Sequence, residues 1–422
     1  MKKFLKITLM ATLQIGSVCA NACAVEVLDN LSQQTLSDAI VTHLAKEYRT
    51  DQSGKFEFPG PCDSVSVRAI GYQRPEQPSH RQEDRLIFRL NPFRPKAIYL
   101  SYWGIGSKEL REKALEIARD TEVNAFVIDI KSDRGELPHR SQVAMVNHVG
   151  AQKNHVVSDM KSLVSTLKGR GLYLIARIVV FKDDLLVQAM PHWAVRDDQG
   201  KVYRDREEQA WVDPSQQDAW SYALDIASEA AEMGFDEIQF DYVRFPDAQG
   251  LKFSIPDNEQ NRESAIVGFL SQARARLAPF NVFLAADVFG YVAWNHNDTH
   301  IGQRLETLVN VLDYVCPMLY PSGFQYGIPG YTNPVEHPYE IVHLSLERAA
   351  QRTGASALHF RPWLQAFRDY AFDKRDFEGN EIRKQIEAAE QFGSGGWMLW
   401  NPRNVYSGEG LAKSKALDTP GK

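Results

Sequence analysis

From about residue 96 onward, short apolar runs alternate with amphipathic segments in a regular order. The apolar runs are rich in β-branched and aromatic residues and are bounded by turn residues, which is typical of buried strands. The predicted strands are 97–102, 125–131, 172–181, 237–245, 282–289, 314–320, 358–367 and 396–400. Apolar residues at helical spacing separate them and predict helices, for example over 108–120, 158–168, 217–233, 261–277 and 381–392.

Strands that alternate with helices indicate a parallel sheet. Eight such units in roughly 300 residues fit a closed (β/α)8 TIM barrel better than an open sheet. The alternative is an open doubly wound sheet, but no Gly-x-Gly-x-x-Gly turn follows the first strand. The run Gly104-Ile105-Gly106 is only a fragment of that motif. We therefore predict a barrel domain over residues 91–410, followed by a tail over 411–422.

The amino terminus predicts export. Three lysines precede an apolar stretch over residues 7–18, and small residues then offer cleavage sites behind Ala20, Ala22 or Ala24. This is the outline of a secretory signal peptide. The stretch is shorter than the roughly 20 apolar residues that span a bilayer, so we expect a periplasmic or secreted protein without a transmembrane segment. Lipid attachment at Cys23 is an alternative, although a leucine normally stands where Ala20 does.

The pattern between the signal peptide and the barrel is weaker. Residues 31–48 show helical spacing of apolar side chains, and residues 71–85 are rich in proline, glutamine and charge. We predict a signal peptide over 1–22 and then a small amino-terminal appendage and linker over 23–90.

Cysteine content and charge limit the chemistry. After removal of the signal peptide, Cys23, Cys62 and Cys316 remain, and their spacing is not that of a metal site. A bridge between Cys23 and Cys62 can form in an oxidising compartment, whereas Cys316 lies in a predicted core strand. The net charge of −6 gives no electrostatic case for nucleic acid. We expect neither a metal nor a cofactor.

The fourth predicted strand ends in Asp241 and breaks at a proline. Successive side chains of a strand point to opposite faces, so Gln239 and Asp241 share one face while Ile238, Phe240 and Tyr242 share the other. If the face of Phe240 packs on helices, Asp241 points into the barrel mouth. Active sites of (β/α)8 barrels lie at the carboxyl ends of the strands, which makes Asp241 a catalytic candidate.

Isolated polar side chains also stand in or at the ends of other predicted strands: Asp129, Lys131, Arg177, Asp287 and Gln365. Such groups are costly in an apolar barrel unless they are paired or hydrated. For Asp129 and Arg177, an internal ion-pair network and a functional role are both consistent with the pattern. For Asp241 and Asp287, on adjacent strands, we favour function.

Two carboxylates across one cavity suit hydrolysis of a glycosidic bond, which needs no cofactor. In this hypothesis Asp241 is the nucleophile or general base, and Asp287 is the general acid or its partner. Aromatic rings near the carboxyl ends of the strands can stack on sugar rings, and these are Tyr102, Trp103, Trp193, Trp211, Tyr242, Tyr320, Phe324, Tyr326 and Trp400. The residues predicted to bind substrate are Asp129, Lys131, Arg177, Trp193, Gln239, Tyr242, Arg244, Tyr320, Gln365 and Trp400.

Several separate motifs resemble one family. They are the run from Phe235 to Pro246, His192-Trp193-Ala194-Val195, Trp211-Val212-Asp213-Pro214, Ala286-Asp287-Val288-Phe289-Gly290, Ile301 to Glu306, Tyr314 to Ser322, His337-Pro338-Tyr339-Glu340, Pro362-Trp363-Leu364-Gln365 and Gly396 to Asn401. In order and spacing they are similar to a glycosyl hydrolase barrel family of bacterial proteins, long catalogued as a domain of unknown function. The resemblance runs from about Arg94 to Tyr406 and implies a TIM barrel and glycoside hydrolysis.

Two alternatives remain at this point. The barrel could bind an envelope polysaccharide without cleaving it, or it could be a metal-dependent esterase or deacetylase acting on sugars. The second alternative requires three convergent metal ligands. The separation of the two carboxylates would distinguish retention from inversion, and the sequence does not give it.

Overall fold

The computed structural model describes residues 22–414. The predicted signal peptide, apart from Ala22, and the tail beyond residue 414 lie outside the described residues.

The chain folds as a (β/α)8 TIM barrel, as predicted. The eight parallel strands close in the order β10-β11-β12-β13-β14-β15-β8-β9. Their bounds are β8 Lys96–Leu100, β9 Ala125–Lys131, β10 Tyr173–Val179, β11 Glu237–Asp241, β12 Phe283–Phe289, β13 Tyr314–Met318, β14 Trp363–Gln365 and β15 Trp397–Trp400. Each overlaps one of the predicted strands.

Helices surround the barrel. The longer ones are α2 Lys108–Asp120, α4 Met160–Lys168, α6 Gln217–Met233, α7 Glu259–Leu277, α9 Pro338–Thr353 and α10 Gly379–Phe392. The shorter ones are α1 Tyr102–Gly106, α3 Ala144–Val149, α5 Asp184–Ala189 and α8 Leu305–Leu308, with 3-10 turns η1 Pro191–Trp193, η2 Ala278–Phe280, η3 Gly290–Ala293, η4 Pro321–Gly323, η5 Pro334–Glu336 and η6 Ala357–His359. Their ends carry ordinary signals: the Ser107 hydroxyl caps α2, and Gly234, with φ +104°, ends α6.

Side-chain alternation separates an inner and an outer core. On β11, Phe240 packs with the outer cluster against the helices, while Gln239 points into the barrel. β11 ends at Asp241, and Tyr242, which follows it with a φ of +50°, packs against the same outer cluster as Phe240, as the alternation predicted. Asp241 is therefore the last residue of the strand, at the carboxyl end of the barrel.

The amino-terminal unit consists of two small sheets. One has the order β4-β1-β7-β6 and the other β3-β2-β5. Their bounds are β1 Ala22–Asp29, β2 Ile40–His43, β3 Lys46–Arg49, β4 Lys55–Pro59, β5 Val65–Arg68, β6 His80–Arg81 and β7 Arg85–Leu90.

The helix predicted over residues 31–48 is wrong, because β2 and β3 form a hairpin there. Leu44 and Ala45 both have positive φ, as in the two-residue turns that join antiparallel strands. The β-branched pair Ile40 and Val41 favours the strand, and sheet pairing overrides the helical spacing.

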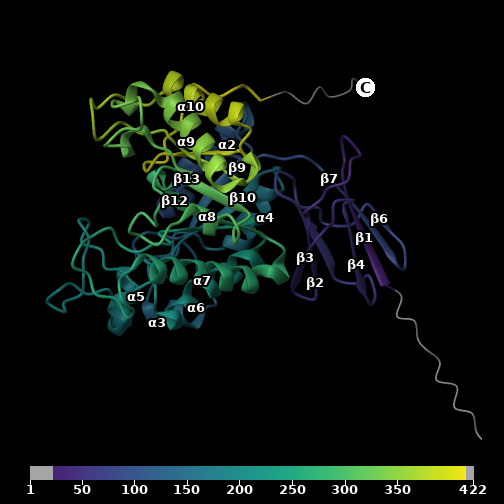
Figure 1. Ribbon diagram of the computed structural model, residues 1–422, viewed down its shortest axis with the longest axis horizontal. Helices are drawn as coiled ribbons and strands as arrows, with labels where there is room; N and C mark the ends of the chain where they lie inside the picture. The colour runs from purple at the N-terminus through teal and green to yellow at the C-terminus, as the bar shows by residue number, and fades with distance from the viewer. Residues whose placement is uncertain (1–21, 415–422) are drawn as a thin grey trace, which may run out of the picture.

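The amino-terminal unit covers the amino-terminal end of the barrel, and Figure 1 shows it in purple at one side of the molecule. The buried Arg68 donates hydrogen bonds to Asp313 (3.2 Å) and Asn281 (3.1 Å), which precede β13 and β12. The stretch predicted as a linker is also attached, because Arg74 donates to the carbonyl oxygen of Phe280 at 2.9 Å. The carboxyl end of the barrel is left free for a site.

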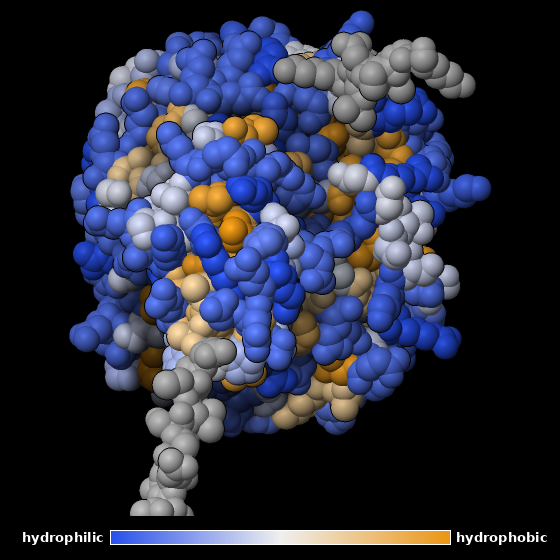
Figure 2. Space-filling model, turned by 90° about the vertical axis from the view of Figure 1, so that its right-hand side faces the viewer, coloured by the Kyte–Doolittle hydropathy of each residue, from blue (hydrophilic) through white to orange (hydrophobic). Residues whose placement is uncertain are grey.

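Figure 2 looks onto the amino-terminal unit, where hydrophilic residues predominate and apolar residues form separate patches. None of the helices within residues 22–414 combines the length and the apolarity that crossing a membrane requires.

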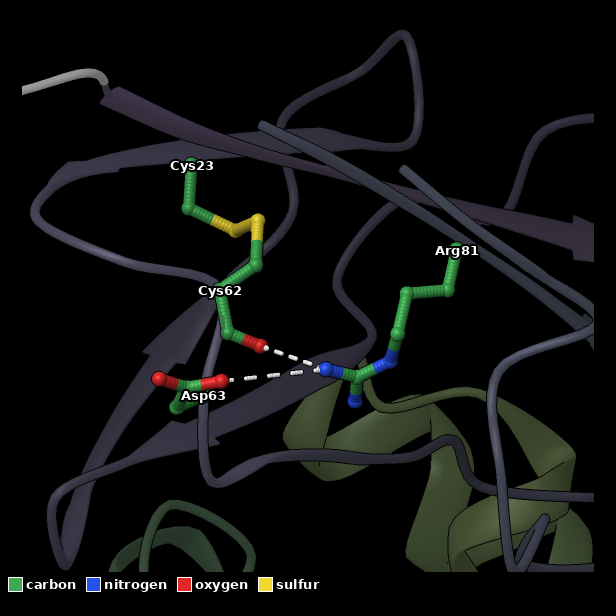
Figure 3. The surroundings of a disulfide bond; sticks show 4 residues. All are labelled: Cys23, Cys62, Asp63 and Arg81. Atoms are coloured by element: carbon green, nitrogen blue, oxygen red, sulfur yellow. Dashed lines mark hydrogen bonds and ion pairs between the residues drawn. A yellow bond between two sulfur atoms is a disulfide. The ribbon is translucent and has the colours of Figure 1, made fainter. Parts of the chain in front are cut away.

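A disulfide joins Cys23 to Cys62, with Cα atoms 5.1 Å apart, and ties the start of β1 to the segment after β4 (Figure 3). Arg81 donates to the carbonyl oxygen of Cys62 at 3.3 Å and lies 3.9 Å from Asp63. Cys316 is free and buried, as predicted for a core strand.

We expect Cys62→Ser to lower the free energy of unfolding of the amino-terminal unit by about 2–4 kcal/mol, because the bridge restricts the unfolded chain. Urea denaturation of the full chain measures this. Reduced wild type should match the variant, and the variant should not respond to reductant. An unchanged unfolding transition in both would contradict a stabilising bridge.

Candidate active site

Arg177 is the centre of a buried charged cluster at the carboxyl end of the barrel. Its Nη1 lies 2.6 Å from Oδ1 of Asp129, its Nε lies 2.9 Å from Oδ2 of Asp241, and the same Nε lies 4.0 Å from Oδ2 of Asp287. Burial lowers the pKa of Arg177, but the carboxylates of Asp241 and Asp129 outweigh burial and hold that pKa well above its usual value. The guanidinium is therefore a permanent cation between three acids.

Hydrogen bonds to both carboxylate oxygens fix the orientation of Asp241. Oδ2 accepts from Nε and Nη2 of Arg177, and Oδ1 accepts from the backbone N–H of Tyr242 at 2.6 Å. The side chain of Asp241 is buried but not sealed, with 6% of the residue exposed.

Asp287 lies on the neighbouring strand and is buried more completely, at 1% exposure. Its Oδ1 accepts from the indole N–H of Trp363 at 2.7 Å, whereas Oδ2 has no hydrogen-bond partner among the described residues. Burial raises the pKa of Asp287 well above its usual value, and the negative charge of Asp241 raises it further. A carboxyl group in this setting retains its proton to higher pH than a solvated one.

Asp129, the third acid, is held by hydrogen bonds. Besides Arg177, its Oδ2 accepts from the Tyr99 hydroxyl at 2.6 Å and from the backbone N–H of Tyr102 at 3.2 Å. Burial raises its pKa, and Arg177 opposes that rise. With every oxygen occupied by a donor, Asp129 positions Arg177 and is not a free acid.

Aromatic rings form the other half of the mouth. Trp400 stacks on Tyr99 with ring centroids 3.9 Å apart, and Arg177 lies over the Trp400 ring at 5.0 Å. Tyr320 packs edge-on against Phe367 at 5.4 Å. Burial raises the pKa of Tyr320 well above its usual value, and the negative charge of Asp287 raises it further, so the hydroxyl stays protonated. Trp400 and Tyr320 are half-buried, so their rings are accessible at the mouth.

Tyr242 and Arg244 form a second layer beside Asp241. Arg244 lies over the rings of Trp211 (4.8 Å) and Tyr242 (5.3 Å), and Lys182 also lies over the Tyr242 ring, at 5.0 Å from its centroid. Both Tyr242 and Arg244 are half-buried, so they border the mouth. Cation–aromatic contacts of this kind fix the rings in place.

Four of the predicted substrate-binding residues do not face this cluster. Lys131 turns outward and lies 2.8 Å from Asp183, because the pairing of β9 with β10 skips residue 130 and reverses the face of Lys131. Gln239 points inward but deeper, with Nε2 3.4 Å from the sulfur of Cys316. Gln365 bonds the backbone N–H and hydroxyl of Ser322. Trp193 is 6% exposed and packs in the outer core.

Two residues of the cluster were not among the predicted site residues. Tyr99 holds Asp129, and Trp363 holds Asp287. Strand alternation offered a signal for both, since Tyr99 shares the inner face of its strand with Ala97, and Trp363 precedes Gln365 by two positions. The pattern places each ring inside the barrel, but it does not reveal which acid the ring contacts.

The sequence was compared with known protein families. Residues 97–406 match the model of a family described as "Putative glycosyl hydrolase domain". The chain belongs to this family. The match confirms the family resemblance and covers every barrel strand but the first residue of β8. A search of curated proteins finds no match to the chain.

Several solved structures are similar to the chain, and of the three described here the glycoside hydrolase domain and the β-galactosidase have the same fold. A hypothetical protein from Ruminiclostridium thermocellum shares 38% identity, with 45% of this chain and 97% of that chain covered, at a TM-score of 0.41. The PgaB (BpsB) glycoside hydrolase domain from Bordetella bronchiseptica shares 13% identity over 74% of this chain and 95% of that chain, at a TM-score of 0.51. A β-galactosidase from the psychrophilic Marinomonas ef1 shares 12% identity over 73% of this chain and 54% of that chain, also at 0.51.

Proposed function

We propose that the chain is an exported glycoside hydrolase that cleaves a poly- or oligosaccharide with two carboxylates. The observation that carries the proposal is the pair Asp241 and Asp287, on adjacent strands at the catalytic end of the barrel and within 4.0 Å of one arginine nitrogen. Membership of the glycosyl hydrolase family supports it.

The environments of the two acids support different roles. Asp241 accepts hydrogen bonds from the Arg177 guanidinium and from the backbone N–H of Tyr242, and these bonds orient its carboxylate for a role as nucleophile or base. Asp287 is buried, beside a like charge, with a raised pKa, as a general acid requires. Asp287 thus protonates the departing oxygen, while Asp241 attacks the sugar carbon or activates water.

The Cys23–Cys62 bridge supports export, because disulfides persist mainly in oxidising compartments. Cleavage of the predicted signal peptide behind Ala20 or Ala22 would keep Cys23 in the mature chain, whereas cleavage behind Ala24 would remove it. A sulfur in a disulfide cannot also carry a lipid, so our proposal is a periplasmic or secreted protein without an anchor at Cys23.

The metal-dependent alternative has less support. Asp129, Asp241 and Asp287 converge on the Arg177 guanidinium, so a side-chain cation already lies among them. No group of three possible ligands with metal-binding geometry occurs within residues 22–414.

An activity screen tests the proposal. Purified protein, with and without EDTA, is incubated with bacterial exopolysaccharides and solubilised peptidoglycan, and reducing ends and released acetate are measured. We expect new reducing ends that EDTA does not suppress. Acetate release that EDTA abolishes would contradict the proposal and favour the metal-dependent esterase.

The pH dependence gives a second test, through Trp363→Phe. Because the acid must carry its proton, kcat/KM should fall as pH rises through the pKa of Asp287. The indole N–H stabilises the charged form of Asp287, so its removal should raise that pKa and move the alkaline limb of the profile to higher pH.

A control for this test is Trp397→Phe, since Trp397 is equally buried but packs in the outer core. The alkaline limb of the kcat/KM profile of Trp397→Phe should lie at the same pH as that of wild type. A uniform loss of activity in Trp363→Phe, with the limb unmoved, would mean that Trp363 only fills space.

A further inference from the structure

The exposed aromatic side chains gather at one end of the barrel. Within residues 22–414, Trp103, Tyr326 and Tyr370 are the aromatic residues that are mostly exposed, at 64%, 91% and 52%. Each follows the carboxyl end of a barrel strand: Trp103 comes after β8, Tyr326 after β13 and Tyr370 after β14. Single exposed apolar residues are ordinary, but their restriction to the end that holds the carboxylates indicates a binding surface.

Trp103 borders the Asp129 side of the cluster. It lies in α1 next to Tyr102, whose backbone N–H donates to Asp129 at 3.2 Å. The two rings meet edge to face with centroids 4.9 Å apart. The Tyr102 ring is buried and packs against Trp103, which itself extends into solvent.

Aromatic rings also lead outward on the Asp287 side. Tyr320 packs on Phe367, and Phe367 is parallel to Tyr370 within 9° at 6.3 Å. Tyr326 is held on the same side of the barrel, because its backbone N–H donates to the hydroxyl of Tyr291, which follows the strand of Asp287, at 2.9 Å. A series of rings therefore continues from the edge of the cluster to the rim.

The two aromatic regions follow different strands around the rim. In the closed sheet, β14 and β15 separate β13 from β8, so Tyr326 and Trp103 stand three strands apart in a ring of eight. Two half-buried rings belong to the same part of the rim: Tyr320 follows β13 by two residues, and Trp400 is the last residue of β15. The aromatic surface thus reaches from β8, which neighbours the strand of Asp129, to the segment after β13, which neighbours the strand of Asp287.

We propose that this surface binds a linear polysaccharide with sugar rings on both sides of the scissile bond, so that the enzyme cuts internal linkages. The inference rests on the proposed hydrolase function and specifies its substrate as a long chain. Flat rings offer apolar faces to sugar C–H groups, and exposed rings on both sides leave both ends of the chain free to extend. An enzyme that trims chain ends would instead need one side of the site to be blocked.

The test compares the time course of two signals on one polymer. The panel contains xanthan, gellan, succinoglycan and solubilised peptidoglycan, and the polymer that wild type cleaves is followed by viscosity and by reducing ends. Internal cleavage predicts a steep fall in viscosity while few reducing ends have formed, with long oligosaccharides as first products. Mono- or disaccharides from the start, with viscosity maintained, would overturn the inference and leave the hydrolase function intact.

Variants locate the surface. Trp103→Ala and Tyr326→Ala should each raise KM for the polymer by about 10-fold, since both side chains project into solvent and their removal spares the core. Leu31→Ala, at a 77% exposed residue of the amino-terminal unit, is the matched control and should leave KM unchanged. Unchanged KM in both aromatic variants would overturn the inference. No cleavage of any polymer would instead overturn the proposed function on which it rests.

Discussion

Asp241→Asn is expected to lower kcat by about 10³-fold or more while the variant still unfolds cooperatively. Asparagine keeps an oxygen that can accept from Arg177, and Arg177 retains Asp129 as its partner at 2.6 Å. The amide cannot act as a nucleophile or a base, so binding survives while turnover is lost.

The measurements are kcat on the cleaved polymer and the urea midpoint of unfolding. Asp225→Asn is the control, because Asp225 is a solvent-accessible acid on α6 that pairs with Arg276. It should retain wild-type activity. An active Asp241→Asn protein, or one that has lost cooperative unfolding, would defeat the assignment of Asp241.

Arg177→Met is expected to have the largest effect on stability, a loss of about 3–5 kcal/mol near neutral pH. Methionine fills a similar volume but leaves Asp129, Asp241 and Asp287 without their shared cation. Burial raises the pKa values of Asp129 and Asp287 and Arg177 opposes that rise, so without Arg177 these pKa values should exceed those in the unfolded chain and the folded state should bind more protons. Stability should therefore recover as pH falls.

Urea denaturation at pH 7 and pH 5 measures this effect. Arg204→Met is the matched control, since Arg204 pairs with Asp184 on the surface at 2.7 Å and such pairs contribute under about 1 kcal/mol. Arg177→Met/Asp129→Asn should regain part of the loss by removing one unpaired charge. Equal small losses in both arginine variants, independent of pH, would contradict the role of Arg177.

The barrel could be predicted from sequence because its signals are local. Each strand is a short apolar run, each helix has its own spacing, and their alternation implies parallel pairing. In the amino-terminal unit the helical spacing over residues 31–48 was misleading, because the hairpin depends on pairing between β2, β3 and β5. Pairing with distant residues is not visible in a local period.

The site could be predicted in part for the same reason. Strand-end position and face parity brought Asp129, Arg177, Asp241 and Asp287 into one cluster, as the alternation predicted. The alternation of inward and outward side chains gave the wrong side for Lys131, because one extra residue in β9 turns this side chain outward. The alternation also does not say how deep in the barrel a side chain lies. Gln239 was therefore expected at the mouth, although it lies below Asp241 inside the barrel.

Partners across the barrel were not predictable. Glu237 lies inside the barrel and pairs with the buried Arg361 at 2.7 Å, and Trp363 meets Asp287, yet nothing in the sequence links either pair. Only closure of the barrel brings such residues together. The structure therefore adds the identity of each contact to a set of side chains that the sequence had placed on the inner face.

The central claim is that the barrel cleaves glycans at Asp241 and does not only bind them. The most direct measurement compares wild type and Asp241→Asn on one polymer of the panel, recording both retention in a native gel that contains the polymer and release of reducing ends. We predict that both proteins are retained and that only wild type releases reducing ends. Retention of both with no reducing ends from either would contradict the claim and indicate a polysaccharide-binding barrel.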